Sequence, residues 1–185
     1  MPFRAFISAD LPDLPQLESV VKELRDASRE LKLVSLERLH LTLKFLGETE
    51  EGLIPEIVSA MREASAGVPP LTVRVRGTGA FPNPARPSVI WVGVEGAEAL
   101  GRIAKSLNEN LQALGFEAEP RAWSPHVTLA RVRRPHGLER VRTILEQRSN
   151  EEFAEVRIED IRLKKSVLQP QGPEYATVES VRLEG

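Results

Sequence analysis

The 185-residue chain has no cysteine and only two methionines, two tryptophans and one tyrosine. Without cysteine it can form no disulfide, no thiolate zinc site and no cysteine nucleophile, and this composition fits a reducing cytoplasm. An excess of one charge is also missing, because 25 Lys and Arg residues are set against 27 Asp and Glu residues. A protein that coats a nucleic-acid duplex through many phosphate contacts is therefore disfavoured, although a local anion site is compatible with this balance.

Long apolar runs are absent as well. Residues 1–7, MPFRAFI, lack the apolar core of a signal peptide, and no run approaches the length of a transmembrane helix. We therefore expect a cytoplasmic protein with no membrane partner. The 41% hydrophobic and 28% charged residues are ordinary for a globular protein that is large enough to bury a sizeable core.

Hydrophobic periodicity predicts alternating strands and helices along most of the chain. Strands are expected over residues 3–9, 39–46, 71–76, 88–94, 127–132, 153–158, 161–168 and 175–183. Helices are expected over residues 14–31, 50–64, 97–114 and 138–148. The Gly- and Pro-rich segment 77–87 is expected to be a loop. The order lacks a strict βαβ rhythm, and neighbouring strands resemble hairpins, so we predict an α+β fold with mostly antiparallel sheet.

Two of the three histidines lie in the same tetrapeptide pattern: residues 40–43 read HLTL and residues 126–129 read HVTL. On a strand, residues i and i+2 point to one face and lie roughly 6.5–7 Å apart. Each motif therefore presents an imidazole and a hydroxyl toward the same space. If the two strands lie side by side, they make a site with four polar side chains.

Such a site suits in-line hydrolysis of a phosphodiester. Two imidazoles with a pKa of about 6.5 can hold opposite protonation states near neutral pH, one as general base and the other as general acid. The hydroxyls of Thr42 and Thr128 can donate to the non-bridging phosphate oxygens. A single histidine on a strand is more often structural, and threonine is a good strand former, so the prediction depends on the duplication.

A metal site is the other chemistry that histidines suggest. These two histidines lie on separate strands, without a His-x-x-x-His spacing or a Cys partner, and would need a distant carboxylate. We therefore expect no metal and no cofactor. His136 follows no Thr pattern, and we expect it to be structural or on the surface.

The paired motifs resemble those of the 2H phosphoesterases, and within them the chain is similar to the RNA 2',3'-cyclic phosphodiesterases once called 2'-5' RNA ligases. The similarity includes the segments RAFI (4–7), HLTLKFLG (40–47), AFP (80–82), VIWVG (89–93), PHVTLAR (125–131) and GPEY (172–175), so it covers essentially the whole chain. It implies a single domain, residues 1–185, made of two interleaved, pseudo-symmetric lobes with antiparallel sheets, helices outside and a central cleft where the motif strands meet.

The resemblance also implies an activity and roles for site residues. The reaction opens a terminal 2',3'-cyclic phosphate of RNA to a 2'-phosphomonoester without a metal, and reversible 2'-5' RNA ligation is a second activity that the resemblance implies. Carried over, His40 is the general acid, His126 is the general base, and Thr42 and Thr128 bind the cyclic phosphate. Arg131 matches an arginine near the substrate phosphate. The assignment of acid and base comes from the resemblance alone, because the two motifs are too alike for spacing to decide it.

Strict alternation makes further predictions for the residues around the motifs. It turns Arg131 away from the His126 face, unless a β-bulge re-aims it, and an exposed arginine without a role is the alternative. Phe6 and Phe45 are spaced as core residues, although they could instead stack on a base. Lys44 is expected on the histidine face. Relatives commonly have a tryptophan shortly before the first motif, where this chain has LVS at residues 33–35, so a platform for substrate is expected to differ.

Two other functions are compatible with these residues. One is a 2H phosphodiesterase of small cyclic nucleotides or 2'-5' oligonucleotides, and the other is a non-catalytic module that binds RNA ends. Comparing turnover of mononucleotides and oligonucleotides would separate the enzymes, and binding without turnover would indicate the module. We expect a monomer whose partner is RNA with a 2',3'-cyclic phosphate terminus or a related nucleotide.

Overall fold

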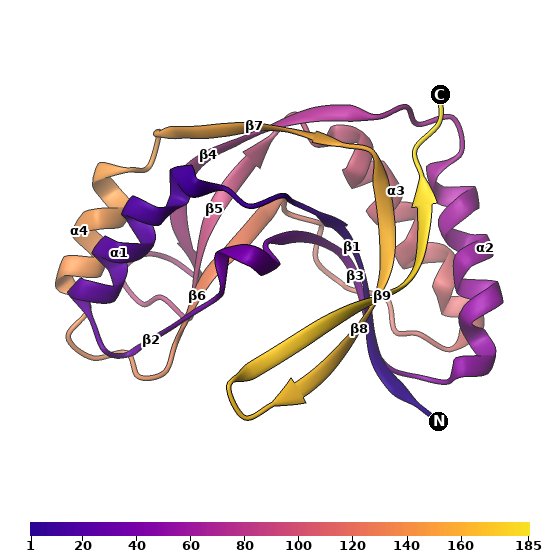
Figure 1. The fold of residues 1–185 in the computed structure, drawn as a ribbon, viewed down its shortest axis with the longest axis horizontal. Coiled ribbons are helices and arrows are strands. Elements are labelled where there is room, and N and C mark those ends of the chain that lie inside the picture. The colour runs from indigo at the N-terminus through magenta and orange to yellow at the C-terminus, as the bar shows by residue number, and fades with distance from the viewer.

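The computed structural model covers residues 1–185 and contains two sheets with helices packed on their outer faces (Figure 1). The first sheet has the strand order β3 (His40–Thr49), β1 (Phe3–Asp10), β8 (Asp160–Gln169) and β9 (Gly172–Arg182). The second has the order β2 (Leu31–Leu33), β6 (His126–Val132), β5 (Val89–Glu95), β4 (Leu71–Phe81) and β7 (Glu152–Ile158). Every strand pair is antiparallel, which confirms the predicted α+β fold.

The helices form two pairs at opposite ends of the molecule. Helix α1 (Glu18–Ala27) packs on α4 (Glu139–Gln147), and α2 (Ile54–Ser65) packs on α3 (Glu98–Asn110) (Figure 1). In α3, the apolar stripe predicted from the sequence is buried at Leu100, Ile103, Ala104 and Leu107. No helix combines the length and the apolar character needed to cross a membrane.

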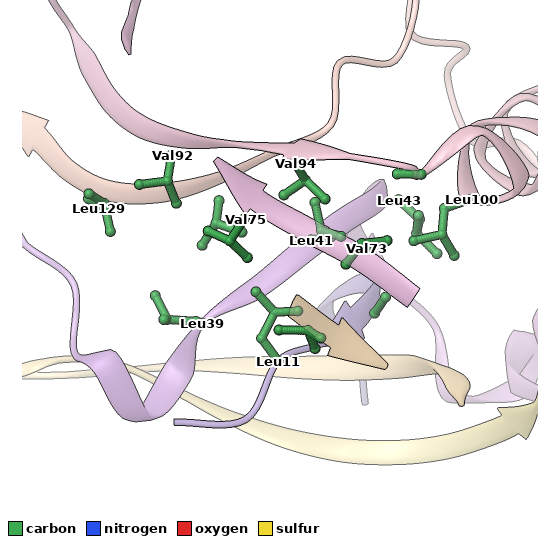
Figure 2. Close-up of a cluster of buried hydrophobic side chains, with 14 of the residues drawn as sticks. Leu11, Leu39, Leu41, Leu43, Val73, Val75, Val92, Val94, Leu100 and Leu129 are labelled. Carbon is green, nitrogen blue, oxygen red and sulfur yellow. The ribbon is translucent and has the colours of Figure 1, made fainter. Parts of the chain in front are cut away.

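Both sheets share one core. A single cluster of 41 buried hydrophobic residues runs between them, and Figure 2 shows part of it. Leu41 and Leu129, which alternate with the motif histidines and threonines, are both fully buried in this cluster. Truncating a buried leucine to alanine typically costs about 2–5 kcal/mol, so turning either leucine out of the core would be similarly unfavourable. The two leucines therefore fix which face of each motif strand is turned away from the core.

Two predicted boundaries were wrong. Strand β4 continues through Phe81, so the glycines expected in a loop lie within a strand. Gly77, with a φ of 76°, lies at a register shift in β4, and Gly79 lies beneath the ring of Trp91, where a Cβ would approach that ring to 2.4 Å. The helix expected over residues 14–31 ends at Ala27, because the chain then enters the short strand β2.

Candidate functional site

The two histidine motifs meet where the sheets approach each other. β3 and β6 are in contact, and each turns its histidine and threonine away from the core as half-buried side chains. The indole Nε1 of Trp123, in the segment before β6, donates a 2.8 Å hydrogen bond to the carbonyl of Thr42 in β3. The structure therefore places the two motif strands in contact with each other.

Both motif strands contain a β-bulge at the same place. Leu43 in β3 and Leu129 in β6 are extra residues that have no partner opposite them in the neighbouring strand. The residue after each extra residue is also buried. From the histidine onward, the side chains of both strands are therefore half-buried, buried, half-buried, buried, buried and exposed, in that order. A bulge of this kind shifts the alternation of side chains by one residue. The two motifs therefore repeat in backbone geometry as well as in sequence.

The bulges change where three predicted residues point. Arg131 is exposed on the His126 face, so strict alternation was wrong for it and the bulge alternative is confirmed. Phe45 is 67% exposed, which contradicts its prediction as a core residue. Lys44 was predicted on the histidine face but is buried on the opposite side, where its Nζ donates to the Asn108 side chain at 2.8 Å and the Glu117 carbonyl at 2.6 Å.

The His40 imidazole lies among aromatic rings and is oriented by its backbone. Its Nδ1 is 2.9 Å from the carbonyl of Arg38, the last residue of the short 3-10 helix η2 (Leu36–Arg38). Tyr175 meets the imidazole edge-on at 5.3 Å between ring centroids, and Phe6, which is buried as predicted, lies at 5.1 Å. Both ring contacts come from other strands of the first sheet.

His126 has a matching environment on the second sheet. Its Nδ1 is 2.7 Å from the carbonyl of Ser124, two residues upstream, as in the first motif. The ring of Phe81 meets it edge-on, with 4.9 Å between centroids. Because a carbonyl can only accept, each Nδ1 carries a proton, and Nε2 is the basic nitrogen of each neutral ring. Both Nε2 atoms are thereby left for proton transfer.

The charges around the two histidines differ. Burial lowers the pKa of His40, the Arg38 carbonyl and the Asp10 carboxylate raise it, and Lys164 lowers it further. Burial also lowers the pKa of His126, the Ser124 carbonyl raises it, and Arg131 lowers it. The carboxylate beside His40 thus favours a proton on that ring, whereas the guanidinium beside His126 favours the neutral form.

Asp10 belongs to a polar network beneath His40 that the sequence did not reveal. Its carboxylate accepts from the Ser8 hydroxyl at 2.7 Å, from Lys164 Nζ at 2.6 Å and from the Arg162 guanidinium at 3.3 Å. These partners keep the pKa of Asp10 below its ordinary value, although burial acts in the opposite direction. A cavity of about 290 Å³ opens here and is lined by Asp10, Leu11, Glu37, Arg38, Leu39, His40, Lys164, Glu174 and Tyr175.

The remaining predicted residues have simple environments. The hydroxyls of Thr42 and Thr128 form no hydrogen bond within the protein, so both are free to donate to a ligand. His136 is exposed in the segment before α4. No three His, Cys, Asp or Glu side chains come together in a group that could hold a metal ion.

Comparisons with known proteins give the family of this chain. The family model for the 2'-5' RNA ligase superfamily matches residues 11–167. A protein of Methanothermobacter thermautotrophicus named RNA 2',3'-cyclic phosphodiesterase is 34% identical over 185 residues, which cover 99% of this chain and 100% of that protein. A protein of the same name from Aeropyrum pernix is 40% identical over 153 residues, covering 82% of this chain and 86% of that one.

Solved structures show the same fold. The crystal structure of a Thermus thermophilus protein matches with a TM-score of 0.80 and 30% identity over 98% of both chains. Escherichia coli LigT, crystallised with 3'-AMP, matches with a TM-score of 0.77 and 20% identity over 100% of both chains, which is a likeness of fold. The resemblance inferred from the motifs is confirmed: this chain belongs to the 2'-5' RNA ligase superfamily.

Proposed function

We propose that this chain hydrolyses the 2',3'-cyclic phosphate at an RNA terminus to a 2'-phosphomonoester, acting as a monomer whose residues 1–185 form a single domain of two lobes. The family and the names of its curated relatives support the reaction. One observation carries the mechanism: each motif strand presents an imidazole whose Nδ1 is bonded to a backbone carbonyl, with a free threonine hydroxyl beside it.

In the proposed mechanism, His126 acts as the general base and His40 as the general acid. Nε2 of His126 accepts a proton from water as the water oxygen bonds to phosphorus. The bond from phosphorus to the 3'-oxygen breaks, and the protonated Nε2 of His40 gives its proton to that oxygen. Thr42 and Thr128 donate to the non-bridging oxygens, and Arg131 adds positive charge where negative charge accumulates.

The unequal electrostatics of the two histidines support this assignment. Burial lowers the pKa of both histidines, and the charges then distinguish them: Asp10 favours the charged form of His40, as an acid requires, against an opposing contribution from Lys164, and Arg131 favours the neutral form of His126, as a base requires. The same groups in the same roles would perform 2'-5' ligation, with the 5'-hydroxyl of a second strand in place of water as the nucleophile, and the reverse cleavage would exchange the roles of acid and base.

The first test is histidine substitution. His40→Ala and His126→Ala should each reduce hydrolysis of a 2',3'-cyclic nucleotide by about 10²- to 10⁴-fold, because each removes a proton-transfer group. His136→Ala is the matched control, since this third histidine is exposed outside the site and its loss should leave the rate unchanged. Activity should persist in EDTA, and product analysis should find 2'-phosphate. Full activity in either motif variant would refute the two-histidine mechanism.

A second test separates the acid from the base. An aryl phosphodiester with p-nitrophenolate as leaving group needs little proton donation, so His40→Ala should lose much less activity on it than on the cyclic phosphate. His126→Ala should be equally impaired on both substrates, because water must still be activated. The opposite pattern would exchange the two roles.

A further inference from the structure

The cationic character of the His126 face continues beyond Arg131. The edge strand β2 pairs antiparallel with β6, and Lys32 lies directly opposite Arg131. Residues directly opposite in an antiparallel pair share a face, with Cβ atoms about 4.5–5.5 Å apart. Because the bulge at Leu129 places Arg131 on the His126 face, Lys32 lies on that face too, at the outer edge of the sheet.

The register that places Lys32 there is firmly held. Leu31 is buried in the shared core, and a slip of one residue would exchange it with the exposed lysine. On either side of this short strand, the Val34 N–H donates to the Leu129 carbonyl at 2.9 Å and the Arg133 N–H donates to the Glu30 carbonyl at 2.7 Å. The orientation of Lys32 is therefore set by the fold.

Placing two cations opposite each other is unfavourable unless something neutralises them. The chain forms ten ion-pair contacts, yet neither Lys32 nor Arg131 takes part in any of them. Two positions along, the Arg133 N–H donates to the Glu30 carbonyl, so residues of opposite charge lie opposite each other there. Since the net charge of the whole chain is −2, this pair of cations is a local feature and not part of a generally basic surface.

We propose that Lys32, together with Arg131, binds a second RNA phosphate, adjacent to the phosphate that reacts. This inference rests on the proposed function, because it takes the His126 face as the place where the reacting phosphate binds. A lysine ammonium is a compact charge on a flexible stem, and contacts of this kind position a nucleic-acid backbone without reading its bases. The site would therefore favour oligonucleotides over mononucleotides, whatever their terminal base.

Two RNA phosphates have this chemistry. One is the phosphodiester upstream of the terminal nucleotide in the cyclic-phosphate strand. The other is the first phosphodiester of a 5'-hydroxyl strand, which enters on the side of the base when the site performs ligation. Both are singly charged phosphodiesters, so hydrolysis and ligation assays are needed to tell which of them Lys32 contacts.

Three substrates test the proposal in hydrolysis. They are a nucleoside 2',3'-cyclic phosphate, a dinucleotide with a 2',3'-cyclic phosphate, and the same dinucleotide with an uncharged methylphosphonate as its internal linkage. Lys32→Ala should raise KM for the charged dinucleotide roughly three- to tenfold and leave the other two unchanged, because only that substrate has a second anionic phosphate. The slope of log KM against log salt should become shallower by about 0.7.

Ligation is tested with a 5'-hydroxyl dinucleotide as acceptor. Lys32→Arg should preserve the wild-type constants in both assays. Lys105→Ala is the matched control, because it removes the same charge from an exposed position on α3, outside the second sheet and both motif strands. Thermal unfolding should be nearly the same for all three variants, since both lysines are exposed.

The outcomes are distinguishable. A loss confined to the charged dinucleotide in hydrolysis supports the site and assigns it to the upstream phosphate, and a loss confined to ligation assigns it to the incoming strand. An equal loss on the mononucleotide, or no loss in either assay, overturns the proposal. Wild-type protein that turns over none of the substrates would refute the proposed function itself.

Discussion

The hydrogen bond from Trp123 to Thr42 is the most direct connection between the two motif strands, and its loss should be measurable. β3 is an edge strand, so one side of its backbone lacks a strand partner, and Trp123 Nε1 satisfies one carbonyl there. Trp123→Phe retains an aromatic ring against Gly101 of α3 but removes the donor. The net loss of one hydrogen bond is about 0.5–1.5 kcal/mol, rising to about 1–3 kcal/mol if the carbonyl is left unpaired.

Denaturant and thermal unfolding would measure this loss, with a fall in Tm of roughly 2–4 °C per kcal/mol for a chain of this length. Trp91→Phe is the matched comparison for stability, because Nε1 of Trp91 is buried but donates to no acceptor. Both variants replace an indole with a phenyl ring, and only Trp123→Phe breaks a bond. The stability difference between them therefore gives an upper value for the contribution of that bond, because Trp91→Phe also removes a buried donor that has no acceptor.

Activity should fall as well, because Trp123 holds the segment before His126 against the strand that carries His40. A displacement of about 1 Å in a catalytic group can cost on the order of 10²-fold in rate, so we expect kcat to fall more than KM changes. The histidine pKa values should stay as they are, since an uncharged group is removed. Wild-type kcat, together with a stability loss no greater than that of Trp91→Phe, would refute this role.

Three further outcomes follow from the site. Asp10→Asn should lower the pKa of His40 and leave that of His126 unchanged, which NMR titration of the three imidazoles can test; an unchanged His40 would contradict the assigned electrostatics. Because burial lowers the pKa of both site histidines below 6.5, the unfolded state binds more protons, and the free energy of unfolding should drop as pH falls below 6.5 in denaturant titrations. Phe45→Ala should leave Tm nearly unchanged, because the ring is 67% exposed, and raise KM if the ring stacks on a base; a large stability loss would restore the core interpretation.

Periodicity was sufficient for the parts of the fold that depend on burial. The alternation around Leu41 correctly predicted which face of the first motif strand enters the core, and the apolar stripe that includes Leu100 and Leu107 correctly predicted α3. These residues make the periodicity visible in the sequence, because replacing a buried apolar residue with a polar one lowers the stability of the protein. The histidine and threonine positions then followed from geometry, since they occupy the opposite face.

The two β-bulges could not be predicted from periodicity. A period of two assumes an unbroken register, and the extra residue at Leu43 or Leu129 breaks it without a distinctive amino acid. Lys44 concealed the first bulge, because a charged residue in a buried position is unexpected from sequence. Its burial depends on acceptors from α3 and from the chain after it, which are 64 and 73 residues away in sequence. Asp10 and Tyr175 likewise reach His40 from other strands, β1 and β9, that periodicity does not place beside it.

The two motif strands have the same backbone geometry, so the residues in which they differ show how the two sides of the site differ. The residue that follows each bulge on the histidine face is Phe45 in β3 and Arg131 in β6, so equivalent positions offer an aromatic ring on one side and a guanidinium on the other. Phe6 and Tyr175 add further rings around His40, where the nearby Lys164 is paired with Asp10, whereas Lys32 adds a second cation without an ion-pair partner beside Arg131. Rings suit a nucleobase and cations suit phosphates. Two similar strands with different flanking residues would thus bind an unsymmetrical substrate. Its nucleoside would lie toward His40, the proposed acid, and its phosphates toward His126, the proposed base.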